Sequence, residues 1–188
     1  MSQTLAHLTS KLTSNQKIFF AEVIGTFILV VFATGSIVID AKMNGVLGIP
    51  FIAFAPFVGV AIGVYLFGKI SMAHFNPAVT LGFLITKHIT KIKLVLYLTA
   101  EIIGALLASL FVKYLFGTQA NLGANAPNYA SYPLALIFGI EVLASALLMA
   151  VILVVVVYTK VLKGLSGIVI GGIVGLDISF WHLYLELL

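Results

Sequence analysis

Long apolar segments separated by short polar ones make up most of this chain. A helix needs about 20 mainly apolar residues to cross the hydrocarbon core of a bilayer. The pattern predicts spanning helices over residues 18–39, 49–67, 94–116, 134–158 and 165–180. The last of these is the least regular, because it is rich in glycine and contains Asp177. The expected fold class is therefore an all-α polytopic membrane protein with about five transmembrane helices.

A shorter apolar segment, residues 77–85, lies between the second and third of these spans. Asn76 is a favoured N-cap residue, and Pro77 suits the first position of a helix. The segment is too short to cross a membrane, so we expect a re-entrant half-helix that returns to the side it came from. Its N-terminus would carry a partial positive charge and free N–H groups into the membrane interior. Such an end can hold small polar molecules and oppose cations.

Composition and charge agree with a membrane protein. The chain is 62% hydrophobic and 9% charged, with a mean hydropathy of +1.21. All ten basic residues are lysines, scattered between the apolar segments, which indicates membrane topology rather than nucleic-acid binding. If the spans alternate, only Lys42 and Lys113 fall on the second side. The positive-inside rule then predicts a multi-pass cell-membrane protein with a cytoplasmic N-terminus, a polar tail over residues 1–16 and a C-terminus outside.

Two carboxylates interrupt the apolar spans in a similar local sequence. Glu22 is followed by Val-Ile-Gly-Thr, and Glu141 by Val-Leu-Ala-Ser. Because three spans separate them, the two would enter the membrane from opposite sides, as in an inverted repeat. Buried carboxylates in a membrane face a cavity or accept hydrogen bonds from backbone N–H groups. A proton relay through Glu22 and Glu141 is the alternative interpretation.

Catalytic and metal chemistry are not indicated. His74 would need partners to bind a metal, and the other three histidines lack ligand spacing. No Ser–His pair or paired aspartates fall on facing spans. We therefore expect no metal, no cofactor and no enzymatic activity.

The residues Ala73-His74-Phe75-Asn76-Pro77-Ala78-Val79-Thr80 resemble the first Asn-Pro-Ala loop of the major intrinsic proteins, the aquaporin and aquaglyceroporin family. The resemblance extends over about residues 18–178, with support from Glu22, Gly25-Thr26 and the glycine patterns of residues 59–65 and 171–175. It implies six spanning helices and two half-helices in two inverted halves. It also implies a homotetramer in the lipid bilayer, each subunit passing water or small neutral solutes such as glycerol.

The same resemblance implies roles for single residues. Asn76 would donate from its amide to the permeating molecule, and Ala78 would pack close to an opposing loop. His74 would line the cytoplasmic half of the pore, whereas Glu22 and Glu141 would each accept hydrogen bonds from loop N–H groups. In the family, the second spanning helix often carries an aromatic residue of the pore's selectivity filter, at a position that falls near Pro56 in this chain. Phe54 and Phe57 flank that position, and both are left open as candidates.

The resemblance breaks off near residue 178. The family continues into a second Asn-Pro-Ala loop, an arginine and a sixth helix, whereas residues 181–188 resemble none of these. We therefore expect a C-terminally truncated or frame-shifted member with an incomplete channel domain over residues 17–180, impaired as a lone chain. Met72 also stands where the family usually has glycine. A non-conducting truncated membrane protein and a proton-coupled transporter are the alternatives.

Overall fold

The computed structural model describes residues 12–124, 132–158 and 164–185, with side chains up to residue 180. Every regular element in these ranges is a helix, as predicted. The helices are α2 (Ser14–Lys42), α3 (Gly48–Ser71), α4 (Pro77–Ile85), α5 (Lys91–Leu115), α6 (Gln119–Gly123), α7 (Leu134–Ile152) with its π-helical continuation η1 (Leu153–Tyr158), and α8 (Ser166–Leu185).

Four of the predicted spans are long and apolar enough to cross a membrane. These are α2, α3, α5 and α7 with η1, whose most apolar stretches have mean hydropathies of 2.2, 2.1, 2.1 and 2.9. The fifth predicted span is the apolar part of α8, Ser166–Phe180, which is shorter. The half-helix has the predicted bounds, Pro77–Ile85. The all-helical polytopic fold class is therefore confirmed.

Local polar contacts set the ends of α2. At its start, Gln16 N–H donates to the Thr13 hydroxyl at 3.3 Å, and Thr13 N–H donates to the Gln16 side chain at 2.9 Å. This capping box begins the helix before the apolar pattern does. At its end, the Asp40 carboxylate accepts hydrogen bonds from the N–H groups of Leu47 at 2.9 Å and Gly48 at 2.8 Å. Asp40 thus closes the turn from α2 into α3.

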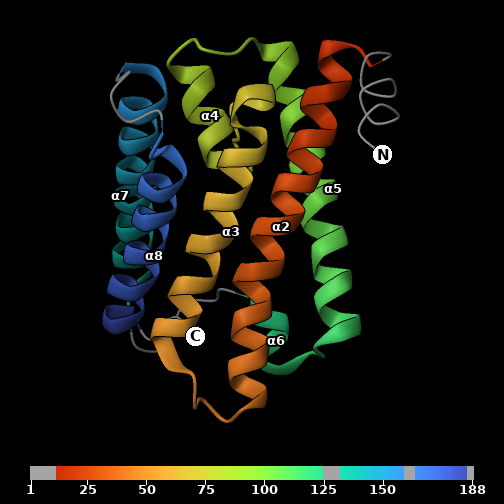
Figure 1. The fold of residues 1–188 in the computed structure, drawn as a ribbon. Helices are drawn as coiled ribbons and strands as arrows, with labels where there is room; N and C mark the ends of the chain where they lie inside the picture. Colours follow the sequence, from red (N-terminus) through yellow and green to blue (C-terminus); the bar gives the residue numbers. More distant parts are fainter. Residues whose placement is uncertain (1–11, 125–131, 159–163, 186–188) are drawn as a thin grey trace.

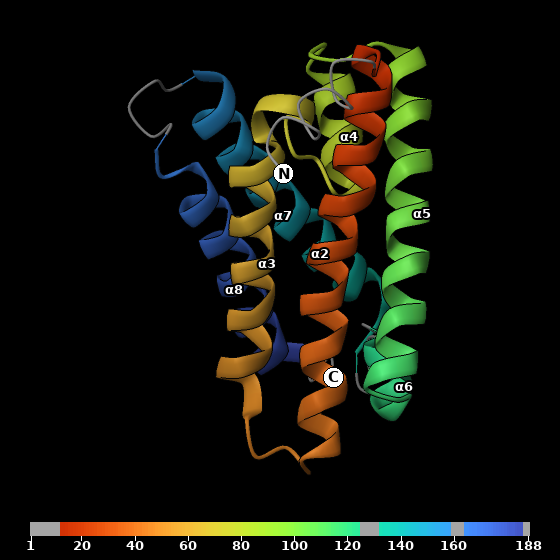
Figure 2. The same ribbon diagram turned by 45° about the vertical axis from the view of Figure 1, so that its right-hand side comes forward.

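The long helices lie roughly side by side, and α4 sits at the end where α2 begins (Figure 1). α2 packs against α3 and α5, α3 packs against α8, and α4 contacts α5 and α7. The turned view shows α2 beside α5 and α3 beside α8 (Figure 2). The close approach of these helices depends on small residues. A methyl group at Gly104 of α5 would overlap the backbone of Val23 on α2, and one at Gly171 of α8 would overlap the backbone of Phe57 on α3. These glycines let the helix backbones meet.

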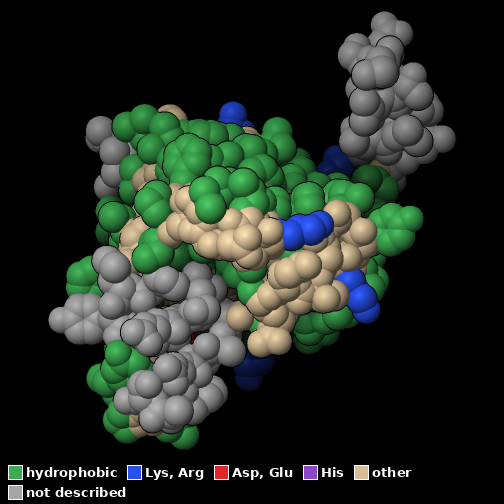
Figure 3. Space-filling model, turned by 90° about the horizontal axis from the view of Figure 1, so that it is seen from below, with side chains coloured by type: hydrophobic (Ala, Val, Ile, Leu, Met, Phe, Trp, Pro, Cys, Tyr) green, Lys and Arg blue, Asp and Glu red, His purple; other side chains and the backbone are tan. Residues whose placement is uncertain are grey.

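The outer surface is that of a membrane protein. Seen from below, hydrophobic side chains cover most of the described surface, with isolated lysines among them (Figure 3). Five of the seven described lysines lie at the end where α2 begins: Lys17, Lys69, Lys87, Lys91 and Lys93. Lys42 and Lys113 lie in the last turns of α2 and α5, at the other end. Only 11% of the most apolar stretch of α7 is buried, against 33–39% for α2, α3 and α5.

Candidate functional site

The segment between α3 and α4 is an irregular backbone placed among spanning helices. Met72, Ala73 and Phe75 have φ angles of 66°, 53° and 51°, in the left-handed region that favours glycine. Each such residue costs of order 1 kcal/mol or more and persists only where its surroundings hold it. Met72 ends α3 in this conformation, which is the conformation a glycine would adopt most easily. The contacts that hold the segment therefore define the site.

Glu22 on α2 holds the centre of the segment. Its side chain is fully buried, and its two oxygens accept hydrogen bonds from the N–H groups of His74 at 3.1 Å and Phe75 at 2.8 Å. The carboxylate satisfies two backbone donors that have no helical partner, which is the arrangement expected when a charge lies in a membrane interior. In this structure Glu22 is a buried carboxylate bonded to two N–H groups of the loop.

The Phe75 ring fixes the same segment between α2 and α3. A methyl group at Gly25 of α2 would overlap this ring, and one at Gly63 of α3 would approach it to 2.7 Å. The ring is 4% exposed and contacts Phe67 edge-on, with centroids 6.3 Å apart. Gly25 and Gly63 therefore form the seat in which the loop side chain packs.

A second carboxylate, which the sequence reasoning missed, holds the segment from α5. Glu101 is 1% exposed, and its Oε1 accepts a hydrogen bond from the Thr80 hydroxyl at 2.5 Å. The same hydroxyl lies 2.8 Å from Nδ1 of His74. Glu101 is a lone carboxylate inside an apolar span, so the argument applied to Glu22 and Glu141 would also have found it. The internal repeat indicates only Glu22 and Glu141, and Glu101 lies outside that repeat.

The His74 ring is held by stacking as well as by hydrogen bonding. It lies between the rings of Phe83 and Tyr97, with centroids 4.4 Å and 4.1 Å away. The Tyr97 hydroxyl donates to the carbonyl of Ser71 at 2.6 Å, which ties the end of α3 to α5. His74 thus joins the loop to both α4 and α5.

Asn76 begins α4 as predicted. Its backbone is extended (φ −151°, ψ 126°), its Oδ1 accepts the N–H of Ala78 at 2.8 Å, and Pro77 occupies the first turn. The Asn76 side chain is half-buried, and those of Pro77 and Ala78 are exposed. With its oxygen used in the cap, Asn76 keeps its amide N–H groups for another partner.

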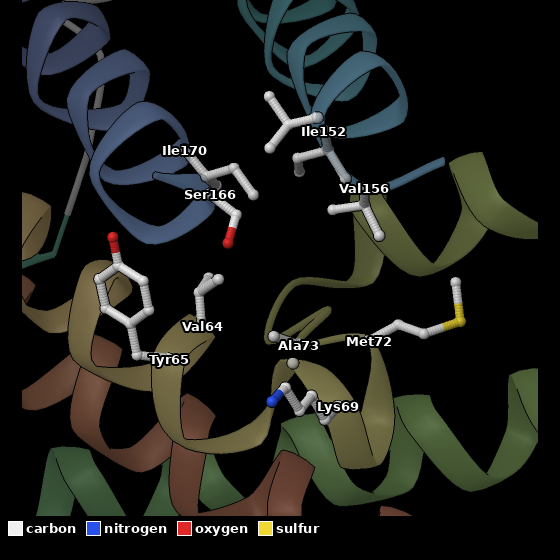
Figure 4. A pocket seen from close by; sticks show the side chains of 11 residues that line it. Val64, Tyr65, Lys69, Met72, Ala73, Ile152, Val156, Ser166 and Ile170 are labelled. Carbon is white, nitrogen blue, oxygen red and sulfur yellow. The ribbon is translucent and has the colours of Figure 1, made fainter. Parts of the chain in front are cut away.

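Two adjoining cavities lead to this segment. The outer cavity, of about 260 Å³, lies between the end of α3, the loop, η1 and the start of α8, with Lys69, Met72 and Ser166 among its lining residues (Figure 4). The inner cavity, of about 160 Å³, reaches His74, Phe75, Asn76 and Asp177. The two share four lining residues: Val64, Ala73, Ile152 and Ile170.

The inner cavity meets the loop through its backbone. The side chains of His74 and Phe75 are 3% and 4% exposed and pack away against aromatic rings and glycines. Their N–H groups bind Glu22, so the carbonyl groups are the polar groups that this part of the loop can offer. Asp177 adds a carboxylate to the lining, and the remaining lining residues, Leu29, Val60, Val79 and Leu148 among them, are apolar. A cavity of this size holds roughly five water molecules, at about 30 Å³ each.

Other predicted site residues lie elsewhere. The Glu141 side chain is exposed on α7, so the prediction that it is buried is wrong for this structure. Its expected partner, a second loop, is not present among the described residues. Pro56 is buried inside α3, Phe54 is 61% exposed, and Phe57 packs towards Gly171 of α8. None of these three lines either cavity, and no cluster of described residues could hold a metal ion.

Comparison with known proteins identifies similar chains. The sequence profile described as major intrinsic protein matches residues 9–184. Aquaporin NIP1-1 of Zea mays is 33% identical over 163 residues, covering 87% of this chain and 57% of that protein. Nodulin-26 of Glycine max is 31% identical over 84% of this chain and 58% of its own length. Glycerol uptake facilitator protein-like 6 of Lactiplantibacillus plantarum is 37% identical over 72% of this chain and 61% of its own. The chain thus spans less than two thirds of these relatives.

Proposed function

The chain belongs to the major intrinsic protein family, and from this premise we propose that it provides a membrane path for passive passage of water or small neutral solutes such as glycerol. The observation that carries the proposal is the pair of adjoining cavities that end at the backbone of residues 73–76 and at Asn76. Names of relatives that include aquaporins and a glycerol uptake facilitator agree with this class of solute.

The chemistry of the inner cavity suits a neutral polar molecule. A permeating water loses hydrogen bonds to bulk solvent and needs a few well-placed partners in an otherwise apolar tube. Carbonyl groups of the loop would supply acceptors, and the Asn76 amide would supply a donor. The N-terminus of α4 lies beside Asn76 and carries a partial positive charge, so it opposes cations at the same point.

Glu22 has a loop-holding role in this proposal rather than a proton-carrying role. Both of its oxygens accept backbone N–H groups, and it does not line either cavity. Loss of these bonds would leave the left-handed Phe75 and its neighbour His74 without support for their N–H groups. The geometry therefore favours a passive channel over the proton-coupled transporter that the sequence left open.

The exposed Glu141 side chain indicates a protein contact on α7. An exposed carboxylate on so apolar a helix is costly against lipid, so the Glu141 face of α7 should meet protein in the membrane. We propose an assembly of several copies, a tetramer by analogy with the family, and a cytoplasmic N-terminus from the lysine asymmetry.

Stopped-flow light scattering on proteoliposomes tests the proposal. The parent chain should raise water permeability above that of protein-free liposomes, although less per copy than a full-length relative if one half-helix acts alone. Ile170→Phe adds bulk where the two cavities meet and should lower the permeability, because Ile170 lines both cavities and is 6% exposed. Ile168→Phe is the matched control, since Ile168 is on the same helix and 50% exposed.

Two results would count against the proposal. A parent chain that leaves permeability at the protein-free value would favour the non-conducting alternative. Equal flux through parent, Ile170→Phe and Ile168→Phe, at matched protein density, would show that water does not follow these cavities.

A further inference from the structure

The hydrogen bonds around Thr80 determine where the proton of His74 lies. A threonine hydroxyl has one hydrogen to donate and can accept through its lone pairs. Thr80 gives its hydrogen to Glu101 at an O···O distance of 2.5 Å, in the range of a hydrogen bond to a charged oxygen. Towards Nδ1 of His74, at 2.8 Å, the hydroxyl can then only accept. Nδ1 must therefore carry the hydrogen.

The other ring nitrogen gives an independent observation. Nε2 of His74 is buried and has no hydrogen-bond partner among the described residues. A hydrogen on Nε2 would be an unpaired buried donor, which is costly. A neutral imidazole has only one N–H, so the proton on Nδ1 leaves Nε2 bare and avoids that buried donor.

The ring also has little freedom to choose another arrangement. It is 3% exposed and lies between Phe83 of α4 and Tyr97 of α5. Turning the ring about the Cβ–Cγ bond would place the carbon Cδ2 where Nδ1 now meets Thr80 and would lose that hydrogen bond, and the backbone of His74 is fixed by Glu22. The position of the ring, and therefore the partner of Nδ1, is set by three helices.

We propose that Glu101 is a positioning residue: acting through Thr80, it holds His74 as the neutral Nδ1–H tautomer and so ties the loop and α4 to α5. Glu22 holds the loop backbone from α2, and Glu101 holds its histidine from the opposite side. The proposal deepens the pore function proposed above, since it assigns how the loop of that pore is kept in place. A test of the Glu101 role does not need a flux measurement.

Solid-state ¹⁵N NMR on the full chain in liposomes reads the tautomer directly. The protein is labelled at histidine in a background of His7→Gln, His88→Gln and His182→Gln, so that His74 gives the only ring signals. Protonated and bare nitrogens differ widely in ¹⁵N shift, and correlation to the ring carbons tells Nδ1 from Nε2. The expected result is a protonated Nδ1 and a bare Nε2.

Variants of the partners test whether Glu101 is responsible. Glu101→Met leaves Thr80 without its acceptor, so the hydroxyl can donate to Nδ1, and Nδ1–H signal should be lost in favour of Nε2–H. Thr80→Val removes the hydroxyl that joins Glu101 to His74, so Nδ1–H signal should again be lost. Thr80→Ser keeps a hydroxyl at this position and should give the parent spectrum. Thr99→Val is the control, because the Thr99 hydroxyl donates to the Val95 carbonyl of its own helix, at 2.7 Å.

Clear results would overturn the proposal. A parent spectrum with the proton on Nε2 would contradict it, as would an unchanged tautomer in the folded variant of Glu101 or of Thr80. If Glu101→Met does not fold, Thr80→Val decides the matter. A chain that shows the Nδ1–H tautomer but conducts no water would support this proposal and contradict the pore function, so the two failures are distinguishable.

Discussion

Replacement of Glu22 by glutamine tests the central contact of the loop. Glu22→Gln keeps the shape of the side chain but leaves one oxygen as acceptor, where the carboxylate has two. One of the N–H groups of His74 and Phe75 would then face the NH₂ group of glutamine. We expect the variant to insert and to keep its helices, with the segment of residues 72–76 opening more often than in the parent.

The size of the effect follows from the two hydrogen bonds. A hydrogen bond to a charged group contributes about 1.5–3 kcal/mol, and a buried donor left unpaired costs about 1–3 kcal/mol. Removing a buried charge relieves part of its desolvation cost, which acts in the other direction. The net loss should therefore lie near the lower values, about 2 kcal/mol. At 1.4 kcal/mol for each factor of ten, this is roughly a 30-fold rise in loop opening.

Hydrogen–deuterium exchange with peptide-level mass spectrometry measures this opening. Peptides that contain residues 72–76 should exchange roughly 30-fold faster in Glu22→Gln, whereas peptides from the middle of α5 should not change. Glu141→Gln is the matched control, because the loop N–H groups are bound by Glu22 and the Glu141 side chain is exposed on α7, so the same substitution there should leave exchange of the loop at the parent rate. Parent-like protection of the loop in Glu22→Gln, or equal losses in both variants, would refute the reasoning.

Three further predictions concern packing, conduction and topology. Gly25→Ala should destabilise the fold by about 1–3 kcal/mol in detergent unfolding, because its methyl group would overlap the Phe75 ring, whereas Gly172→Ala has no atom within 4 Å and should be neutral or stabilising. Asn76→Asp keeps the helix cap but removes the amide donor and adds a negative charge, so proteoliposomes should lose water flux or leak cations. If the variant equals the parent in both light scattering and electrical recording, Asn76 serves only as a helix cap. Reporter fusions should place the N-terminus in the cytoplasm and the C-terminus outside, and a C-terminal reporter active only in the cytoplasm would contradict five spans.

Much of the helical arrangement follows from local sequence signals. The bounds of α4 agree with the prediction because Asn76 and Pro77 are local signals for the start of a helix, and α4 ends where the apolar segment does. The long helices were predicted to within a few residues, and the misfit at α2 has a local cause. Its start lies at Ser14 because of the capping box at Thr13, which the apolar pattern does not report.

The partners of the loop depend on contacts that are distant in the sequence. Glu22 and His74 are 52 positions apart, and Thr80 and Glu101 are 21 apart, so no local pattern reports that they meet. The sequence prediction did not single out Glu101, and only the packing of α4 on α5 places it beside Thr80. Glu141 shows the reverse case, since its local sequence resembles that around Glu22 while its side chain is exposed.

The sequence by itself therefore determined the membrane-spanning helices, the half-helix and the family, because apolar length, helix caps and a continuous motif are properties of neighbouring residues. The tertiary structure alone decided which carboxylates hold the loop, where the Phe75 ring packs and which residues line the two cavities. The physical reason is that a buried charge or a left-handed residue is stable only when a particular partner lies within hydrogen-bond distance. That partner comes from another helix, and only the packed structure determines which one.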